Sequence, residues 1–499
     1  MIAVLWAGPG AGAPVPAQRG ELRIAMQYDR GSMDPAVLSA VTDKQMTVNV
    51  FEGLVRHALG TVKIEPALAE SWTMAPDGKT WTFKLRRGVR FHKEFGEMQA
   101  SDVKFSLERI QAPALKSPYS QLMASLERVE VLDRHTVRIL LNSPDPAFLD
   151  KLAQSFGAIV SEKAVKARGD KFDQDPVGTG RYQFSSWAPQ QETVFTPFDE
   201  YWGGRPALAR VVYVPIPDST TMFNAFEAGD VHLVQVTDPD KLKKYRQNSK
   251  MTVVETPGLI TRFFGMNRLH KPFDDIKVRT AVLHAVNRTE IVQFLFGGVS
   301  TPARSILAPG VLHAEPNVMQ YRFDPSRAKR LLAEAGYPNG FRTTFYVPNI
   351  DRFTRPATVI QQHLRGVGIE IEIRVMEVTS FLARLRSAEG MPMFTLSRGQ
   401  DPAPDRVLYI WFHSSGIPRD NWANISIPEV DRWLDEALRT LNEDRRKELF
   451  SLAQKRIVDE AHYFFIDHEN HIFAMQARVK GFVGDPQRSI RLDNVSVER

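Results

Sequence analysis

Hydrophobic and polar residues alternate along many short stretches of this chain, a pattern typical of half-buried strands. The stretch 21–27 places its apolar residues on one face, and 80–85 (TWTFKL) alternates without a break. We therefore predict a strand in each of these two stretches. Further strands are expected at 129–132, 136–141, 182–184, 193–195, 211–216, 231–236, 251–255, 260–266, 343–347, 369–375, 393–396, 463–466 and 472–474.

Apolar residues recur at helical spacing in other parts of the chain. The stretch 44–55 is predicted to be one helix, and Ser101 is expected to cap a helix over 102–110. Asp218 and Gly229 have the residue types that begin and end a helix. Other helices are expected at 147–153, 162–167, 275–286, 288–296, 325–335 and 358–365.

The order of these elements predicts two lobes and an insertion. At 499 residues the chain is too long for one hydrophobic core. The strand pattern of the first lobe resumes at 211–216, so we expect 45–175 to be an inserted subdomain. Beyond residue 267, helices and strands alternate, which favours a second α/β lobe. The prediction is lobe I at 20–260 and 478–499, lobe II at 261–477, and two crossings near 258–266 and 475–481.

Composition narrows the class of protein. The chain is 43% apolar and 24% charged, as globular domains are, and its net charge of +6 is spread out rather than concentrated in runs. Nucleic acid and membrane surfaces are therefore not indicated as partners, although a basic surface favours anionic ligands. The chain has no cysteine, so disulfides, thiolate zinc sites, cysteine nucleophiles and lipidation on cysteine are excluded.

The first 19 residues are rich in Ala, Gly and Pro and begin with a short apolar segment. The sites Ala11-Gly12-Ala13 and Val15-Pro16-Ala17 suit a signal peptidase, so we predict the remains of a secretory signal. A disordered tail is the alternative.

Closely spaced motifs occupy 176–204. Gly178 and Gly180 flank Thr179 and permit a sharp turn, and no Gly-x-Gly-x-x-Gly follows that would indicate phosphate binding. Together with Tyr201-Trp202-Gly203-Gly204, this turn resembles the signature of extracellular solute-binding proteins of family 5, although Arg181 replaces the usual Pro. These proteins, among them dipeptide- and oligopeptide-binding proteins, serve peptide/nickel-type ABC importers. Matching motifs continue at 34–35, 52–54, 66–72, 100–106, 272–275, 331–337, 428–431 and 479–482.

The resemblance implies an α/β fold of the type II periplasmic binding class, in its large three-part subclass, with a hinge between two lobes. It further implies a non-enzymatic, monomeric binding protein that needs no cofactor. From the apolar N-terminus and the absence of cysteine we expect a soluble periplasmic protein that is not lipid-anchored. Such a protein captures a small solute, here expected to be a peptide or peptide-like molecule, and delivers it to the permease of an ABC importer. The alternatives are a secreted hydrolase and a periplasmic chaperone-like binder.

The stretch 398–406 follows a predicted strand and is expected to be a charged, Pro-broken loop in the binding site. In peptide-binding members, an acidic residue of the matching loop pairs with the ligand's α-ammonium group. Alignment on Asp405 places Gln400 at this position, and a shift of one residue places Asp401 there, so we expect Asp401 or Asp405 to meet a cationic group of the ligand. Arg398 is suited to an anion instead, and a solvated loop is the alternative.

Further ligand contacts are expected at positions where family members contact ligand or where aromatic and amide groups suit a cleft wall. Each of these residues has packing as its alternative. They are Gln27, Tyr28, Arg352, Trp411, Asn421 and Trp422.

No metal or catalytic residues are predicted. His462, His468 and His471 lie near Asp467 and Glu469, but on a strand residues three apart point to opposite faces. Neither His-Glu-x-x-His nor Gly-x-Ser-x-Gly occurs.

Overall fold

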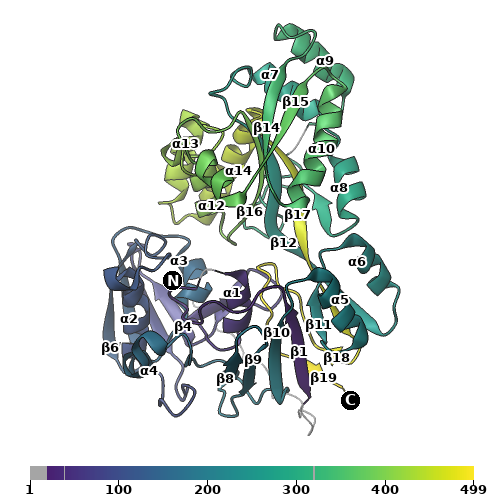
Figure 1. Ribbon diagram of the computed structural model, residues 1–499. Helices are drawn as coiled ribbons and strands as arrows, with labels where there is room; N and C mark the ends of the chain where they lie inside the picture. Colours follow the sequence, from purple (N-terminus) through teal and green to yellow (C-terminus); the bar gives the residue numbers. More distant parts are fainter. Residues whose placement is uncertain (1–19, 39, 319–320, 499) are drawn as a thin grey trace.

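The computed structural model describes residues 20–38, 40–318 and 321–498, so the predicted signal segment lies outside the described residues. Figure 1 shows an upper and a lower body joined by two long strands, β12 (Met251–Met266) and β17 (Tyr463–Gln476). Among the described residues these strands belong to one 11-stranded sheet, in the order β15-β14-β16-β12-β17-β11-β1-β10-β9-β8, with β13 beside β17. Its other strands are β1 (Glu21–Met26), β8 (Tyr182–Ala188), β9 (Glu192–Pro197), β10 (Arg210–Pro215), β11 (Leu233–Gln235), β13 (Ser300–Pro302), β14 (Arg342–Pro348), β15 (Glu370–Met376) and β16 (Met393–Gly399).

The lower body is built around β1, which pairs in parallel with β10 and β11. Helix α5 (Ser219–Ala228) begins at Asp218, whose side chain accepts a hydrogen bond from Thr221 N, and it ends at Gly229, as predicted. The apolar face of this helix is buried with that of α6 (Pro239–Arg246) in one cluster. Two short pairs also lie in this body: β2 (Val55–His57) with β3 (Ile64–Pro66), and β18 (Val479–Lys480) with β19 (Ser496–Val497).

The signature turn (178–180) and the segment 201–204 both contact Glu52. These contacts give the two motifs a structural role. The Glu52 carboxylate accepts hydrogen bonds from Thr179 Oγ1 at 2.9 Å, Trp202 Nε1 at 2.9 Å and Tyr201 OH at 2.8 Å. Burial raises the pKa of Glu52, and these three donors oppose the rise. A Cβ atom on Gly178 would lie 2.0 Å from the Val50 carbonyl oxygen, so only glycine fits this approach.

The predicted helix at 44–55 is wrong beyond Thr47. Helix α1 spans Val41–Thr47, and the chain then extends to meet the signature turn. The carbonyl groups of Asn49 and Val50 accept hydrogen bonds from the amides of Tyr182 and Gly180 instead of continuing the helix. A long-range contact therefore overrides the local helical pattern.

The inserted region contains a four-stranded sheet in the order β4-β5-β7-β6. The alternating stretch at 80–85 forms β5 (Thr80–Leu85) with the predicted bounds. The expected cap at Ser101 is wrong: helix α2 (Ala100–Glu108) begins two residues before its predicted start, and Gln99 and Asp102 form a capping box. The remaining elements are β4 (Ala69–Met74), β6 (Leu126–Asp133), β7 (Thr136–Leu141), α3 (Phe148–Leu152) and α4 (Glu162–Arg168).

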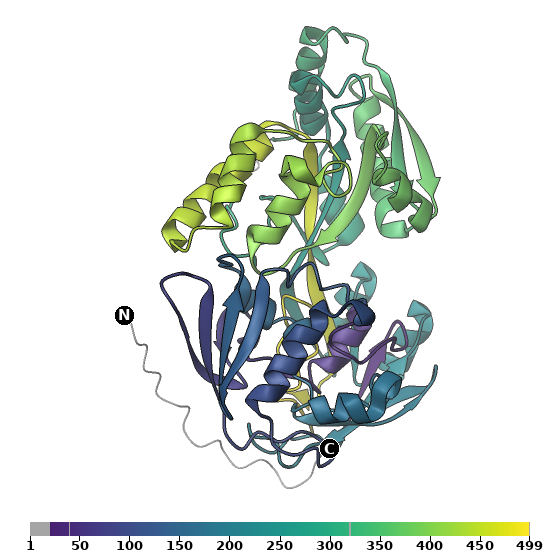
Figure 2. The same cartoon turned by 90° about the vertical axis from the view of Figure 1, so that its left-hand side faces the viewer.

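The upper body packs helices on both sides of β14, β15 and β16 and contains two hydrophobic clusters. Figures 1 and 2 both show helices α12 to α14 standing over the inserted region. The two parts touch there, because a Cβ atom on Gly78 would lie 2.5 Å from Leu441. The helices are α7 (Ile276–Ala285), α8 (Arg288–Phe296), α9 (Pro325–Glu334), α10 (Asp351–Arg365), α11 (Val378–Leu385), α12 (Pro404–Phe412), α13 (Pro428–Ala437) and α14 (Glu443–Asp459).

The two crossings between the bodies are formed by β12 and β17, which pair antiparallel along most of their length. The two strands expected at 251–255 and 260–266 are a single strand with a bulge between Pro257 and Ile260. Ile260 pairs with Glu469, so antiparallel pairing places the return crossing there. We expected it at 475–481, but Met475 already pairs with Leu233 of the lower body.

Candidate functional site

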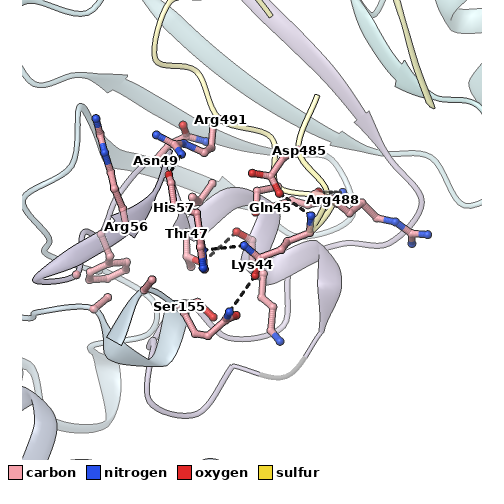
Figure 3. Close-up of a pocket in the computed structure, with 18 of the residues that line it drawn as sticks. Lys44, Gln45, Thr47, Asn49, Arg56, His57, Ser155, Asp485, Arg488 and Arg491 are labelled. Atoms are coloured by element: carbon pink, nitrogen blue, oxygen red, sulfur yellow. Dashed lines mark hydrogen bonds between the residues drawn. The ribbon is translucent and has the colours of Figure 1, made fainter. Parts of the chain in front are cut away.

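A cavity of about 370 Å³ lies where the lower body meets the crossing strands and the end of β16. Its walls come from α1, the segment 485–493, residues 259–260 of β12 and residues 399–401 of the upper body. Figure 3 shows the charged and polar side chains on its lower-body wall. Because both bodies supply lining residues, a solute held here contacts both.

Three of the arginines in this wall share one acidic partner, Asp493. Asp493 accepts hydrogen bonds from Arg491 at 2.9 Å and Arg181 at 3.4 Å, and its carboxylate is 3.5 Å from Arg56. Although burial pushes the pKa of Asp493 upward, the arginines lower it below its ordinary value. These three arginines are therefore committed to Asp493.

Lys44 differs from the other cations of the cavity. Within the described part of the chain, its Nζ atom forms no ion pair and no hydrogen bond; it lies 5.9 Å from the centre of the Tyr119 ring, and in Figure 3 no dashed line reaches it. Burial lowers the pKa of Lys44, and Asp401 on the opposite side partly offsets this. A partly buried ammonium group without a counter-ion is suited to an anionic group of a ligand.

Asp401 and Asp405, the two carboxylates expected to anchor an ammonium group, are both paired with arginines. The stretch 398–406 is not one loop, because β16 extends to Gly399 and α12 begins at Pro404. Asp405 is buried in α12 and accepts hydrogen bonds from Arg446 at 2.7 and 2.8 Å. Asp401 lines the cavity and forms a more exposed pair with Arg406 at 2.8 Å.

Gln400 lines the cavity but has its side chain fully engaged within the protein. Its Nε2 atom donates to Thr261 Oγ1 and to the Ile306 carbonyl, each at 3.0 Å, and its Oε1 accepts from Ala308 N at 2.6 Å. This side chain therefore ties the end of β16 to β12 and to the loop at 306–308.

Arg398 and three of its neighbours form a packed unit. The Arg398 guanidinium donates to Asp420 at 2.9 Å and lies 4.0 Å from the ring of Trp422 and 5.0 Å from that of Trp411. Burial lowers the pKa of Arg398 to about 10, and Asp420 opposes the shift. Asn421 is fully buried and bonds only to backbone atoms of the described chain.

The remaining predicted contacts are exposed. Gln27 and Tyr28 follow β1 directly, and Tyr28 is 63% exposed. Arg352 lies in the first turn of α10 and acts electrostatically on Glu469 and Arg488, which places it on the upper side of the crossing strands. The structure thus places Gln400 and Asp401 in the cavity wall. Arg352 does not line the cavity but acts electrostatically on Arg488, which does.

Sequence reasoning missed Lys44, Arg488 and Asp493. Lys44 belongs to a helix that was assigned to packing, and nothing in its spacing distinguishes it from a solvated lysine. The only signal for the other two is a Pro- and Arg-rich stretch at 485–493.

The histidines near the crossing have internal partners. Thr261 Oγ1 lies 2.8 Å from His468 Nδ1, and Arg488 donates to His471 Nδ1 at 3.3 Å. In the described residues, no group of three His, Cys, Asp or Glu side chains is arranged to hold a metal ion. None of the helices in the described ranges has the length and apolarity to cross a membrane.

Two α/β bodies joined by a pair of crossing strands, with a cavity between them, define a bilobal solute-binding protein. The sequence model of bacterial extracellular solute-binding proteins, family 5 Middle, matches residues 63–419, and the chain belongs to this family. It is 33% identical over 463 residues to the heme-binding protein A of Haemophilus influenzae, covering 88% of this chain and 85% of that protein. It is 29% identical over 489 residues to the dipeptide-binding protein of Escherichia coli, covering 92% and 91%.

A solved structure confirms the predicted fold. The periplasmic binding protein from Helicobacter pylori in complex with the peptide STSA superposes with a TM-score of 0.79 at 29% identity, covering 96% of this chain and 98% of that one. The protein is therefore the substrate-binding component of an ABC importer, in a family that is not enzymatic. The hydrolase interpretation is set aside.

Proposed function

We propose that this protein captures a peptide or peptide-like solute with a free carboxylate between its two bodies and delivers it to a membrane permease. The observation that carries the proposal is Lys44, a partly buried cation in the cavity wall for which the described residues supply no ion-pair partner within contact distance. A solute carboxylate would supply one.

A peptide also brings an ammonium group, and Asp401 is the acid best placed to receive it. Using Asp405 would break a buried pair with Arg446, whereas the Asp401–Arg406 pair is half exposed and is worth at most about 1 kcal/mol. Lys44 and Asp401 act on each other electrostatically from opposite walls. A zwitterionic peptide matches this pair of charges.

The comparisons support the peptide class, because one relative is named for dipeptides and one similar structure holds a peptide. Among the other expected contacts, we keep Gln400 as a wall residue and Arg352 as an additional cation. Closure of the upper body on the lower body, with 45–175 as a subdomain of the lower one, would bury the solute. We place the protein in the periplasm as a secreted monomer without a lipid anchor.

The test is calorimetry with trialanine and its C-terminal amide. We expect the wild type to bind the free acid at least tenfold more tightly, and Lys44→Met to remove this preference. Lys455→Met is the matched control, because Lys455 is exposed on α14 and outside the cavity. A chaperone-like binder would bind both peptides equally, and equal binding by the wild type would contradict the proposal.

A further inference from the structure

Glu469 lies at the point where the chain returns from the upper to the lower body. Its backbone pairs with Ile260 of β12 on one side and Ser300 of β13 on the other. Next to it, a Cβ atom on Gly258 would lie 2.6 Å from the Glu469 carbonyl oxygen. Because the strands are packed so closely here, the backbone of Glu469 is held in place and its side chain extends from a fixed position.

The Glu469 carboxylate joins arginines from different parts of the fold. Arg262 of β12 donates to its Oε1 atom at 3.0 Å. Arg488 of the lower body, which lines the cavity, lies 3.6 Å from its Oε2 atom. Arg352 of α10 acts on Glu469 electrostatically and has no ion pair among the described residues.

The arginines outnumber the acids that face them. Asp467 lies 3.5 Å from Arg262. The cluster therefore contains two carboxylates, of Asp467 and Glu469, and the guanidinium groups of three arginines. Burial pushes the pKa of Glu469 upward, but Arg262, Arg352 and Arg488 together hold it below its ordinary value. Glu469 is therefore ionised, and among the described residues it is the acid that lies within ion-pair distance of the Arg488 guanidinium group on the cavity wall.

We propose that Glu469 is the resident counter-ion of Arg488 and that the carboxylate of a bound solute competes with it for this arginine. Glu469 is then a positioning residue that limits the preference of the site for anions. Because it lies on β17, it also links the solute carboxylate, through Arg488, to the crossing strands. This inference rests on the proposed function, and it concerns how strongly the site selects charge rather than whether it does.

The test compares the affinities of trialanine and its C-terminal amide in variants of Glu469. Removing the competing charge with Glu469→Gln should increase the acid-to-amide preference about fivefold to tenfold, since a charge a few ångströms away in a partly buried site acts strongly. Arg488→Gln should reduce the preference. Glu469→Asp should keep the wild-type value, and Glu65→Gln, which removes the partner of another cavity arginine, Arg56, should do the same.

The outcomes separate the two proposals. A wild type without preference for the acid overturns the proposed function. A wild type with that preference and a Glu469→Gln variant without an increase overturns only the role of Glu469, since a purely structural residue would weaken the binding of acid and amide alike. If Glu469→Gln does not fold, an unchanged preference in Arg488→Gln overturns the inference and a reduced preference supports it.

Discussion

Arg446 Nη2 donates to both carboxylate oxygens of Asp405, at 2.7 and 2.8 Å, and joins helix α14 to helix α12. Both side chains are almost completely buried, at 7% and 6% exposure. Burial raises the pKa of Asp405, and the charge of Arg446 opposes that rise. Asp405 therefore serves the packing of the upper body.

Asp405→Asn is expected to reduce the free energy of unfolding by about 3 kcal/mol, because it removes the buried partner of Arg446 and leaves only the exposed carboxylate of Glu443, at 2.9 Å, to pair with this buried charge. Asp401→Asn is the matched control: its pair with Arg406 is exposed, so the expected loss is under about 1 kcal/mol. Urea unfolding of both variants measures this difference. Equal stabilities would show that the buried pair adds nothing to the fold.

The stability of the protein should fall as the pH drops from 7 to 5. Burial lowers the pKa of several histidines well below 6.5, so the unfolded chain takes up protons first. Their contribution is complete above pH ~6.5 and is lost as the pH falls toward the folded pKa values, at up to about 1.4 kcal/mol per pH unit for each group. The pKa is lowered to about 4 for His92, His232 and His468, and to about 3 for His462 and His471.

Acids whose pKa is raised by burial act in the opposite direction, and they are Asp43, Glu52, Asp102, Asp405, Asp467 and Asp485. Burial raises the pKa of Asp467 to about 6, so this group stabilises the fold at low pH and loses its effect as the pH rises from about 4 to 6. Its effect on the pH dependence of stability cancels about that of one histidine. Thermal unfolding across this range measures the sum, and His462→Gln should reduce the slope. A stability that is independent of pH between 7 and 5 would refute the account.

Gly258→Ala should destabilise the crossing strands. The added Cβ atom would lie 2.5 Å from His471 Nε2 and 2.6 Å from the Glu469 carbonyl oxygen, so the strands must separate at a cost of about 1–3 kcal/mol. At Gly399 an added Cβ atom meets nothing within 4 Å, so Gly399→Ala provides the control. Thermal unfolding of both variants is the measurement, and similar melting temperatures would contradict the close packing at Gly258.

Elements with strong local signals could be predicted from the sequence. The stretch 80–85 forms β5 within its predicted limits because every second residue is buried against the same layer. Asp218 and Gly229 bound α5 because capping is decided by neighbours in the chain. The helix at 44–55 was wrong because its end is decided by the signature turn, more than a hundred residues away.

The site was less predictable for the same reason. Whether Asp401 and Asp405 are available to a ligand depends on their pairing with Arg406 and Arg446, and for Lys44 it depends on the lack of an ion pair within the described ranges. None of these follows from local spacing. The family resemblance pointed to the stretch around Gln400, and this stretch lines the cavity. It did not show that the Gln400 side chain is bound by the protein itself.

Native mass spectrometry of the protein purified from its own host tests the central claim most directly. The account predicts one intact peptide-like solute with a free carboxylate per chain, lost when Lys44→Met is purified in the same way but retained by Lys455→Met. A solute without an anionic group, or one retained equally by Lys44→Met, would contradict the account.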